Sequence, residues 1–388
     1  MNGDPRDPGT AGAAPRFLRT ASIAAGDPAA MAQLAAQVGP GMALVLLFVS
    51  PATDFAEAMT AAKRAFGNTP LLGCTTAGEI AGGYVEDRIV ATGFPARDFA
   101  VETIAVPDLS QIEAPELVDR MVRARQNLAA RHPDMAHEFA YLLVDGSRFR
   151  EDALMSVVGH GLGPVPLFGG SAGDRRDFGQ TYVAQDARVH TNAAFLTFFR
   201  TRCPVKVFSF DHLEVGSSRM VVTRADPARR QVQEINAAPA ALEYARLLGK
   251  PPGQLDPFIF AAHPLAVRAG GRYHVRSIQR VDNGTDLIFF SAIDEGVVLT
   301  LAKPRDIARS LAENLADLAA AGPLDSILAC DCVLRHVEAE QKQQLREVSE
   351  VLARHNVTGF LTYGEQFGAM HVNLTITGVA IYAPEDEA

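Results

Sequence analysis

The sequence is poor in the residues that build metal and disulfide sites. Its 388 residues include only four cysteines, at positions 74, 203, 330 and 332, and no two of them are spaced as C-x-x-C. This spacing fits neither a zinc site nor a disulfide framework. The chain also lacks a secretory start, so we expect a reducing, cytoplasmic location.

Basic runs and long apolar runs are missing as well. The formal net charge is −9 and no Lys/Arg-rich run occurs, so the electrostatic footprint of a nucleic-acid-binding protein is absent. The longest apolar run, Ala43–Val49, is far shorter than the roughly 20 residues that span a bilayer. Neither a P-loop nor a G-x-G-x-x-G follows an expected strand, so nothing supports nucleotide-dependent chemistry.

What is present is typical of a globular protein with two or three domains. Hydrophobic residues make up 48% of the chain and charged residues 21%, which is enough apolar surface for a sizeable core. The first residues are rich in Pro, Gly and Ala, and we expect residues 1–38 to form a disordered lead. The loop Pro251-Pro252-Gly253 is a candidate boundary between domains.

A short turn that contains glycine and then an acid occurs three times. The copies are Ala77-Gly78-Glu79, Ala172-Gly173-Asp174 and Tyr363-Gly364-Glu365. Each follows a predicted strand, helix and strand, and each precedes another strand. The leading strands are 42–50, 139–144 and 326–332, the helices 53–66, 150–162 and 339–355, and the closing strands 88–94, 193–199 and 374–382.

This order predicts repeated supersecondary units. A strand joined through a helix to its neighbour usually makes a right-handed parallel crossover, and the strand after the tight turn should return antiparallel. We therefore predict an α/β fold with layered mixed sheets, built from repeated strand-helix-strand-turn-strand units in two modules. Between the second and third units, we expect a helix over 240–248, a strand over 258–261 and a hairpin at Asp282-Asn283-Gly284.

The turn acids Glu79, Asp174 and Glu365 are candidate site residues. Polar turns at strand ends are where α/β proteins commonly bind ligands. The alternative is that these carboxylates accept hydrogen bonds from backbone N–H groups within their own turns. A structural repeat would produce the same recurrence, so both interpretations remain open.

Two residues suggest nucleophilic chemistry. Ser171 lies in a G-x-S-x-G segment, as in α/β hydrolases, where the serine occupies a sharp turn between a strand and a helix. The segment after Ser171 is not helical in pattern, which favours a plain glycine-rich turn. Cys74 would need a nearby histidine or a helix N-terminus to become nucleophilic, and structural burial is the commoner role of such a cysteine.

His371 lies in the segment Gly368-Ala369-Met370-His371-Val372-Asn373, which the other two copies lack. Imidazole and thioether are both axial ligands of haem iron. A single histidine has no spacing to test, and a core or turn histidine is the alternative. His263, His274 and His336 are comparable candidates. No C-x-x-C-H occurs, which excludes covalent c-type haem.

Several long segments together resemble the FIST proteins, a family of sensory domains. LLGCTTAGEI and PLFGGSAGDRRDFGQTYV look like the glycine-rich segments of the FIST N-terminal module. The segment from HPLAVRAGG to VVLTLA, then CDCVLRHVEAE and TYGEQFGAMHVNLTITGVAIY, look like the C-terminal module. The resemblance implies an N-terminal module over 39–234 and a C-terminal module over 235–384.

Within that family, TYGEQFGAMHVN is most similar to the nitric-oxide-sensing NosP branch. This resemblance implies haem binding, nitric oxide sensing and relay to a separate histidine kinase or cyclic-di-GMP synthase or phosphodiesterase. On this interpretation the haem-binding residues are His371 as the iron ligand, with Met370, Tyr363 and Glu365. Because no catalytic constellation is evident, we expect a sensor and not an enzyme. The alternatives are a module that binds a small metabolite such as an amino acid, and a hydrolase that uses Ser171.

Overall fold

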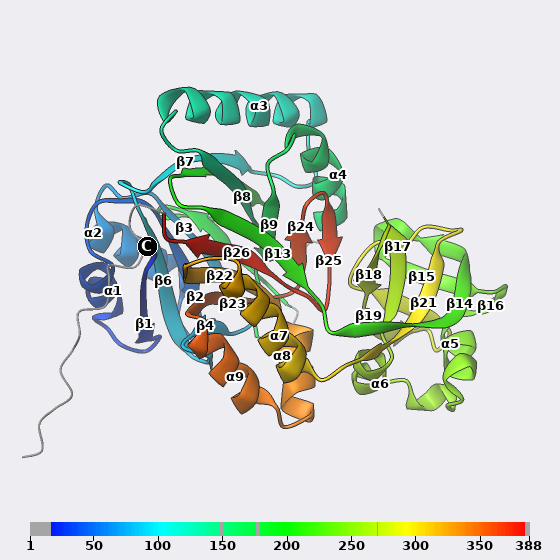
Figure 1. Cartoon of the computed structure of the whole chain (residues 1–388). Coiled ribbons are helices and arrows are strands. Elements are labelled where there is room, and N and C mark those ends of the chain that lie inside the picture. The colour runs from blue at the N-terminus through cyan, green and yellow to red at the C-terminus, as the bar shows by residue number, and fades with distance from the viewer. Residues whose placement is uncertain (1–16, 148–149, 176–178, 270, 385–388) are drawn as a thin grey trace, which may run out of the picture.

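The chain folds into a body of three similar units and one smaller domain, as the computed structural model in Figure 1 shows. The structure describes residues 17–147, 150–175, 179–269 and 271–384. In this part of the chain the body contains three six-stranded mixed sheets, and the smaller domain contains an eight-stranded antiparallel sheet. The predicted α/β fold of layered mixed sheets is confirmed.

The first unit shows the pattern that the other two repeat. In chain order, its elements are β1 (Arg19–Ala24), α1 (Ala30–Val38), β2 (Met42–Val49), α2 (Phe55–Phe66), β3 (Leu71–Thr75), β4 (Glu79–Ala81), β5 (Tyr84–Val85) and β6 (Arg88–Pro95). Strands β2 and β3 are parallel, and β6 returns antiparallel beside β2. The predicted lead over residues 1–38 overlaps β1 and α1, and its first 16 residues lie outside the described residues.

The second and third units follow the same order. The second consists of β7 (Phe99–Val106), α3 (Ala114–Arg131), β8 (His137–Val144), α4 (Glu151–Gly161), β9 (Leu167–Ser171), β10 (Val183–Gln185), β11 (Arg188–His190) and β12 (Ala194–Thr201). The third consists of β13 (Val205–Phe210), α7 (Ile307–Ala320), β22 (Leu324–Cys332), α8 (Val333–Gln341), α9 (Leu345–Arg354), β23 (Val357–Thr362), β24 (Glu365–Phe367), β25 (Met370–Val372) and β26 (Ile376–Tyr382).

The smaller domain is inserted into the third unit, between β13 and α7. Its elements are β14 (Leu213–Asp226), the 3-10 turn η1 (Pro227–Arg229), β15 (Gln231–Ile235), β16 (Ala238–Pro239), α5 (Ala240–Leu248), the 3-10 turn η2 (Pro252–Gln254), α6 (Pro257–Ala262), β17 (Leu265–Ala269), β18 (Arg272–Arg276), β19 (Ile278–Asp282), β20 (Asp286–Phe289) and β21 (Val298–Pro304). Figure 1 shows it beside the three-unit body. The module boundary expected between residues 234 and 235 falls inside β15.

Two local expectations for this inserted domain had different outcomes. The hairpin at residues 282–284 is confirmed, because β19 and β20 are antiparallel neighbours, with Asn283 and Gly284 left-handed between them (φ 50° and 75°). The predicted strand over 258–261 is wrong, since these residues belong to α6. The carboxylate of Asp256 caps that helix by accepting from the backbone N–H of Ile259 at 2.8 Å.

The three units exchange their hairpins in a closed cycle. The β4–β5 hairpin of the first unit pairs with β23 of the third. The β24–β25 hairpin of the third pairs with β9 of the second, and the β10–β11 hairpin of the second pairs with β3 of the first. Each sheet is therefore completed by a hairpin from another unit, so the units are topologically interdependent.

A ring of three equivalent backbone hydrogen bonds joins the units at their glycine-rich turns. The bonds run from Gly173 N to Thr75 O (3.0 Å), from Ala77 N to Leu361 O (3.0 Å) and from Tyr363 N to Ser171 O (3.2 Å). This ring aligns Gly173 with Ala77 and not with Gly78. Consequently Glu79 and Glu365 are equivalent residues, whereas Asp174 is displaced by one position from them.

The largest apolar core lies among the three sheets and contains side chains from all of them. Phe48 of β2 stacks on Phe360 of β23 with ring centroids 4.6 Å apart, and Phe139 of β8 stacks on Phe199 of β12 at 4.5 Å. Such aromatic pairs stabilise a core beyond the burial of their area, by about 0.5–1.5 kcal/mol each. Among the described residues, no helix has the length and apolar character that crossing a membrane requires.

Candidate functional site

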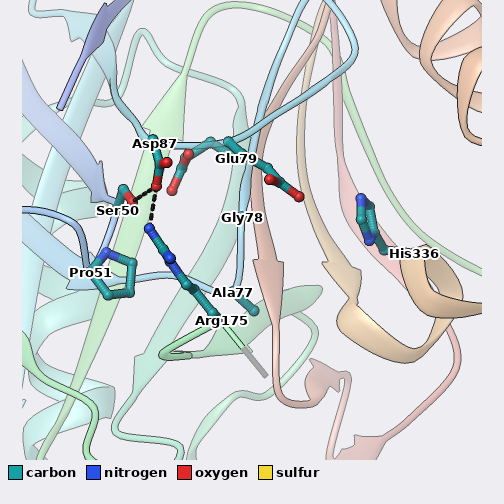
Figure 2. A pocket seen from close by; sticks show the side chains of 9 residues that line it. Ser50, Pro51, Ala77, Gly78, Glu79, Asp87, Arg175 and His336 are labelled. Atoms are coloured by element: carbon teal, nitrogen blue, oxygen red, sulfur yellow. Dashed lines mark hydrogen bonds and ion pairs between the residues drawn. The ribbon is translucent and has the colours of Figure 1, made fainter. Parts of the chain in front are cut away.

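A polar pocket opens where all three units meet, at the carboxyl ends of β2 and β3 (Figure 2). Its volume is about 290 Å³. We call it the strand-end pocket. The first unit contributes Ser50, Glu79 and Asp87, the second contributes Arg175, and the third contributes His336 from α8. The ends of parallel strands are the usual place for ligands in α/β folds.

Local backbone requirements place the first unit's side chains at this pocket. Gly78 has φ +142°, and a Cβ there would lie 2.8 Å from a methyl carbon of Leu361. Glycine therefore allows the close turn that delivers Glu79 to the start of β4. Asp87 precedes β6 in a left-handed conformation (φ 53°), which Asp tolerates better than most residues.

Glu79 is the buried acid of the pocket. Its carboxylate accepts a hydrogen bond from the Thr76 hydroxyl and another from the backbone N–H of Arg88 at 3.2 Å. Burial raises the pKa of Glu79 to about 7, with smaller upward contributions from Asp87 and Glu86. The carboxyl group can therefore change its ionisation near neutral pH.

Asp87 and Arg175 form an ion pair at the mouth of the pocket. Their side chains are 60% and 53% exposed, and the Ser50 hydroxyl donates to the same Asp87 oxygen at 3.3 Å. Figure 2 shows this pair on one side of the pocket and the Glu79 side chain extending toward His336 on the other. The pocket thus presents negative groups together with one accessible guanidinium.

A buried polar network fixes the helix that carries His336. Asp331 accepts from the Tyr84 hydroxyl at 2.5 Å and from Arg335 Nε at 2.7 Å. A second guanidinium nitrogen of Arg335 lies 2.8 Å from His212 Nδ1, and His212 Nε2 lies 2.8 Å from Glu338. Burial raises the pKa of Tyr84 well above its usual value, so its hydroxyl remains a donor.

The turn residues Glu365 and Tyr363, predicted as cofactor contacts, are hydrogen-bonded to other groups of the protein. The Glu365 carboxyl oxygens accept from the Thr362 hydroxyl at 2.5 Å and from the Thr375 hydroxyl and N–H at 2.8 and 3.2 Å. Burial raises its pKa to about 8. The Tyr363 hydroxyl accepts from the backbone N–H of Asp174 at 3.1 Å. Glu365 is therefore held by two threonines, one of them ten positions away, rather than by the backbone N–H groups of its own turn.

His371 lies buried in β25, and its ring packs over the backbone of Gly364. A Cβ on Gly364 would lie 2.3 Å from His371 Cε1 and 2.9 Å from Nε2, and His371 Nδ1 lies 3.3 Å from the Gln366 amide nitrogen. Burial lowers the pKa of His371. Met370 is its neighbour on the same strand, so the two side chains point to opposite faces.

These residues do not fit an axial haem set as they are packed. His371 is 3% exposed, its Nδ1 lies next to the Gln366 amide, and the strand-end pocket is lined by other side chains. Among the described residues, no three His, Cys, Asp or Glu side chains are grouped to hold a metal ion. Haem ligation by His371 would require the β24–β25 hairpin to move.

Ser171 and Cys74 occupy structural positions. The buried Ser171 hydroxyl donates to Glu151 at 3.2 Å and accepts from the Gln366 amide at 3.0 Å. In a serine hydrolase the nucleophilic serine is instead hydrogen-bonded to a histidine. The next described element after β9 is the strand β10 and not a helix. Cys74 is buried, and burial raises its pKa well above the usual value.

The structure also brings to the strand-end pocket several residues that the sequence patterns did not single out. Ser50, Asp87 and Arg175 are the main additions, and Glu79 is the one predicted turn acid that lines the pocket. Asp87 and Arg175 are 88 positions apart, so no local pattern joins them. For Asp87, the available sequence signal was its position as a polar residue directly before the closing strand of the first unit.

Comparisons with known proteins agree with the sequence resemblance. The chain matches the family described as FIST N domain over residues 43–238 and the family described as FIST C domain over residues 240–368. A search of curated proteins found no match. FIST domains are sensory and ligand-binding domains. The chain therefore belongs to the FIST family of sensory signal-transduction proteins.

Proposed function

We propose that this protein senses a small zwitterionic metabolite, of the amino-acid class, that binds in the strand-end pocket. The observation that carries this proposal is the Asp87–Arg175 pair, which presents both signs of charge at the pocket mouth. A zwitterion can replace such a pair by offering one complementary group to each partner. The pair is more than half exposed, so exchanging it for a ligand costs little stability.

The charge and shape of each side chain in the pocket indicate which end of the ligand it binds. The planar guanidinium of Arg175 matches a carboxylate, which it can hold through two hydrogen bonds. The carboxylates of Asp87 and Glu79 accept from an ammonium group, and the nearby Glu86 adds negative potential. The pocket volume of about 290 Å³ lies just below the usual range of about 300–1,000 Å³ for small-molecule sites. A small metabolite suits this space better than a macrocycle.

Thermal unfolding in the presence of amino acids, simple amines and simple carboxylates tests the proposal. A ligand at 100 times its dissociation constant should stabilise the protein by about 2.7 kcal/mol. The expected result is a rise in Tm with at least one amino acid that disappears in Arg175→Ala. The matched control is Arg123→Ala, which removes an exposed Arg–Asp pair on α3 and should keep the response. A response that survives Arg175→Ala would contradict the site.

Haem binding with nitric oxide sensing is the second proposal, and the resemblance to the NosP branch supports it. Titration with haem, with and without nitric oxide, is its direct test. Because His371 is enclosed, we expect any haem spectrum to be the same in His371→Ala. A Soret band that depends on His371 would show that the β24–β25 hairpin opens.

We further propose that the output passes to a separate histidine kinase or cyclic-di-GMP enzyme in the cytoplasm, as the resemblance implies. Such relay requires that the signalling enzyme distinguish the free from the ligand-bound protein. Autophosphorylation of the host's histidine kinases and cyclic-di-GMP turnover, each measured with both forms of the protein, test this step. A partner whose activity changes with the added ligand is the expected result, and equal activity with both forms would contradict relay.

A further inference from the structure

A second pocket, with apolar walls, lies between the third unit and the inserted domain. Its volume is about 290 Å³. We call it the apolar pocket. Leu334 of α8 and Leu374, which precedes β26, line it from the third unit. Phe260 of α6, Ile278 of β19 and Phe290 face it from the inserted domain.

One residue of this pocket, Leu374, is the third unit's counterpart of Asp87 in the strand-end pocket. In each unit a residue at the carboxyl end of the first parallel strand donates its backbone N–H to a carbonyl near the start of the closing strand. The residue with that carbonyl directly follows a residue in the left-handed conformation. These bonds are Ser50 N to Arg88 O (3.1 Å), Asp145 N to Ala193 O (2.9 Å) and Cys332 N to Thr375 O (3.0 Å). The left-handed residues are Asp87 (φ 53°), Asn192 (φ 55°) and Leu374 (φ 54°). Asp87 lines the strand-end pocket, and Leu374 lines the apolar pocket.

Leucine is an unusual choice for this position. Asp and Asn tolerate the left-handed conformation because their short side chains bond locally, whereas a bulky apolar residue there is an outlier. Strained residues of this kind cluster at ligand-binding and switch regions. Leu374 replaces the polar group of its two counterparts with an apolar surface, and it does so where the inserted domain adds further apolar side chains.

Two polar groups in the same pocket indicate the rest of the ligand. Ser277 is 3% exposed, and its hydroxyl has no hydrogen-bond partner among the residues that the structure describes. A buried hydroxyl without a hydrogen-bond partner lowers the stability of the fold. A ligand group that accepts a hydrogen bond from Ser277 would remove this cost. Arg280 also lines the pocket, with its side chain 55% exposed. A hydroxyl donor and a guanidinium together select a ligand group that accepts hydrogen bonds and carries negative charge.

We propose that the apolar pocket binds a small apolar carboxylate, such as a medium-chain or aromatic acid. The hydrocarbon part packs against Leu334, Leu374 and Phe260, and the carboxylate accepts from the Ser277 hydroxyl and pairs with Arg280. Because the walls come from both the third unit and the inserted domain, the ligand contacts both at once. This inference is independent of amino-acid binding in the strand-end pocket.

Isothermal titration calorimetry with octanoate as the probe tests the site, with octylamine as the cationic analogue of similar length. The expected result is saturable octanoate binding, at least about tenfold weaker in Ser277→Ala because a hydrogen bond to a charged group is lost. Octylamine should bind at least about tenfold more weakly than octanoate. Ser156→Ala, which removes an exposed hydroxyl on α4, is the matched control and should leave octanoate binding unchanged.

A second variant keeps the test independent of the serine. Ala261→Phe places a large side chain in the pocket, and octanoate binding should be lost while thermal unfolding remains cooperative. Octanoate that does not bind saturably to the wild-type protein would overturn the proposal. So would equal octanoate affinity in the wild type, Ser277→Ala and Ala261→Phe, or octylamine that binds as tightly as octanoate.

Discussion

Asp87 of the first unit and Arg175 of the second, 88 positions apart in the chain, form an ion pair at the mouth of the strand-end pocket. Both side chains are more than half exposed, and such pairs typically stabilise a fold by less than about 1 kcal/mol. The pair therefore has little structural importance. Its position at the pocket mouth fits the proposed ligand, which carries both charges.

Asp87→Asn should weaken amino-acid binding and leave the fold intact. Loss of a charge-assisted hydrogen bond costs about 1.5–3 kcal/mol, which is at least about tenfold in affinity. The free energy of unfolding in urea should change by less than about 1 kcal/mol. Calorimetry and urea titration measure the two quantities. Asp119→Asn on α3 is the matched control, and an equal loss of affinity in both variants would argue against a direct role for Asp87.

Amino-acid affinity should rise with pH up to about pH 7. Burial raises the pKa of Glu79 to about 7, and only its ionised form attracts an ammonium group. Below that pH, binding must release one proton, so affinity should fall by up to about tenfold per pH unit. Titrations at pH 5.5, 6.5 and 7.5 measure this slope. Glu79→Gln should have a flatter profile, and an unchanged slope in that variant would assign the proton to another group.

Stability should fall between about pH 4.5 and pH 8 because of Glu365. Burial raises the folded-state pKa of this carboxyl to about 8, while in the unfolded chain it ionises near 4.5. The folded protein therefore holds a proton that the unfolded chain has lost, and stability declines as pH rises through this window. The slope is at most about 1.4 kcal/mol per pH unit for one group. Urea unfolding at pH 6, 7 and 8 should show a smaller decline in Glu365→Gln than in the wild type; an equal decline would contradict the prediction.

Tyr84→Phe should destabilise the third unit, although Tyr84 belongs to the first. Its hydroxyl donates to the buried carboxylate of Asp331 in β22, and removing one partner from a buried polar pair costs about 1–3 kcal/mol. Amide hydrogen exchange should accelerate in β22 and β23 more than in β2. Tyr273→Phe in the inserted domain is a control of the same chemistry. Faster exchange confined to β1–β3 would contradict the hairpin exchange between units.

The repeated units could be predicted from sequence because their signals are local. An apolar strand such as Met42–Val49 and the helix that follows it each carry a periodic pattern over consecutive residues. The exchange of hairpins could not be predicted, because strands as short as Tyr84–Val85 have no pattern and their partners lie far away in the chain. The Asp87–Arg175 pair could not be predicted for the same reason, because its two residues are 88 positions apart in the chain.

The wrong strand prediction in α6 and the unforeseen enclosure of His371 have similar physical causes. The apolar run in α6 fits either a buried strand or a buried helix, and the capping Asp256 followed by Pro257 was the overlooked helix signal. The enclosure of His371 depends on Gly364. Because glycine has no side chain, the imidazole ring can fill the space beside its backbone. A histidine in a distinctive loop can therefore be a packing residue, and only the three-dimensional contacts distinguish the two roles.

Calorimetric titration of one amino acid and its two single-charge analogues tests the zwitterion site most directly. The analogues are the amine without the carboxylate and the carboxylic acid without the amine, each with the same side chain. If Asp87 and Arg175 each hold one end of the ligand, the amino acid binds and both analogues bind at least about tenfold more weakly. An analogue that binds as tightly as the intact amino acid would contradict a site that recognises both charges.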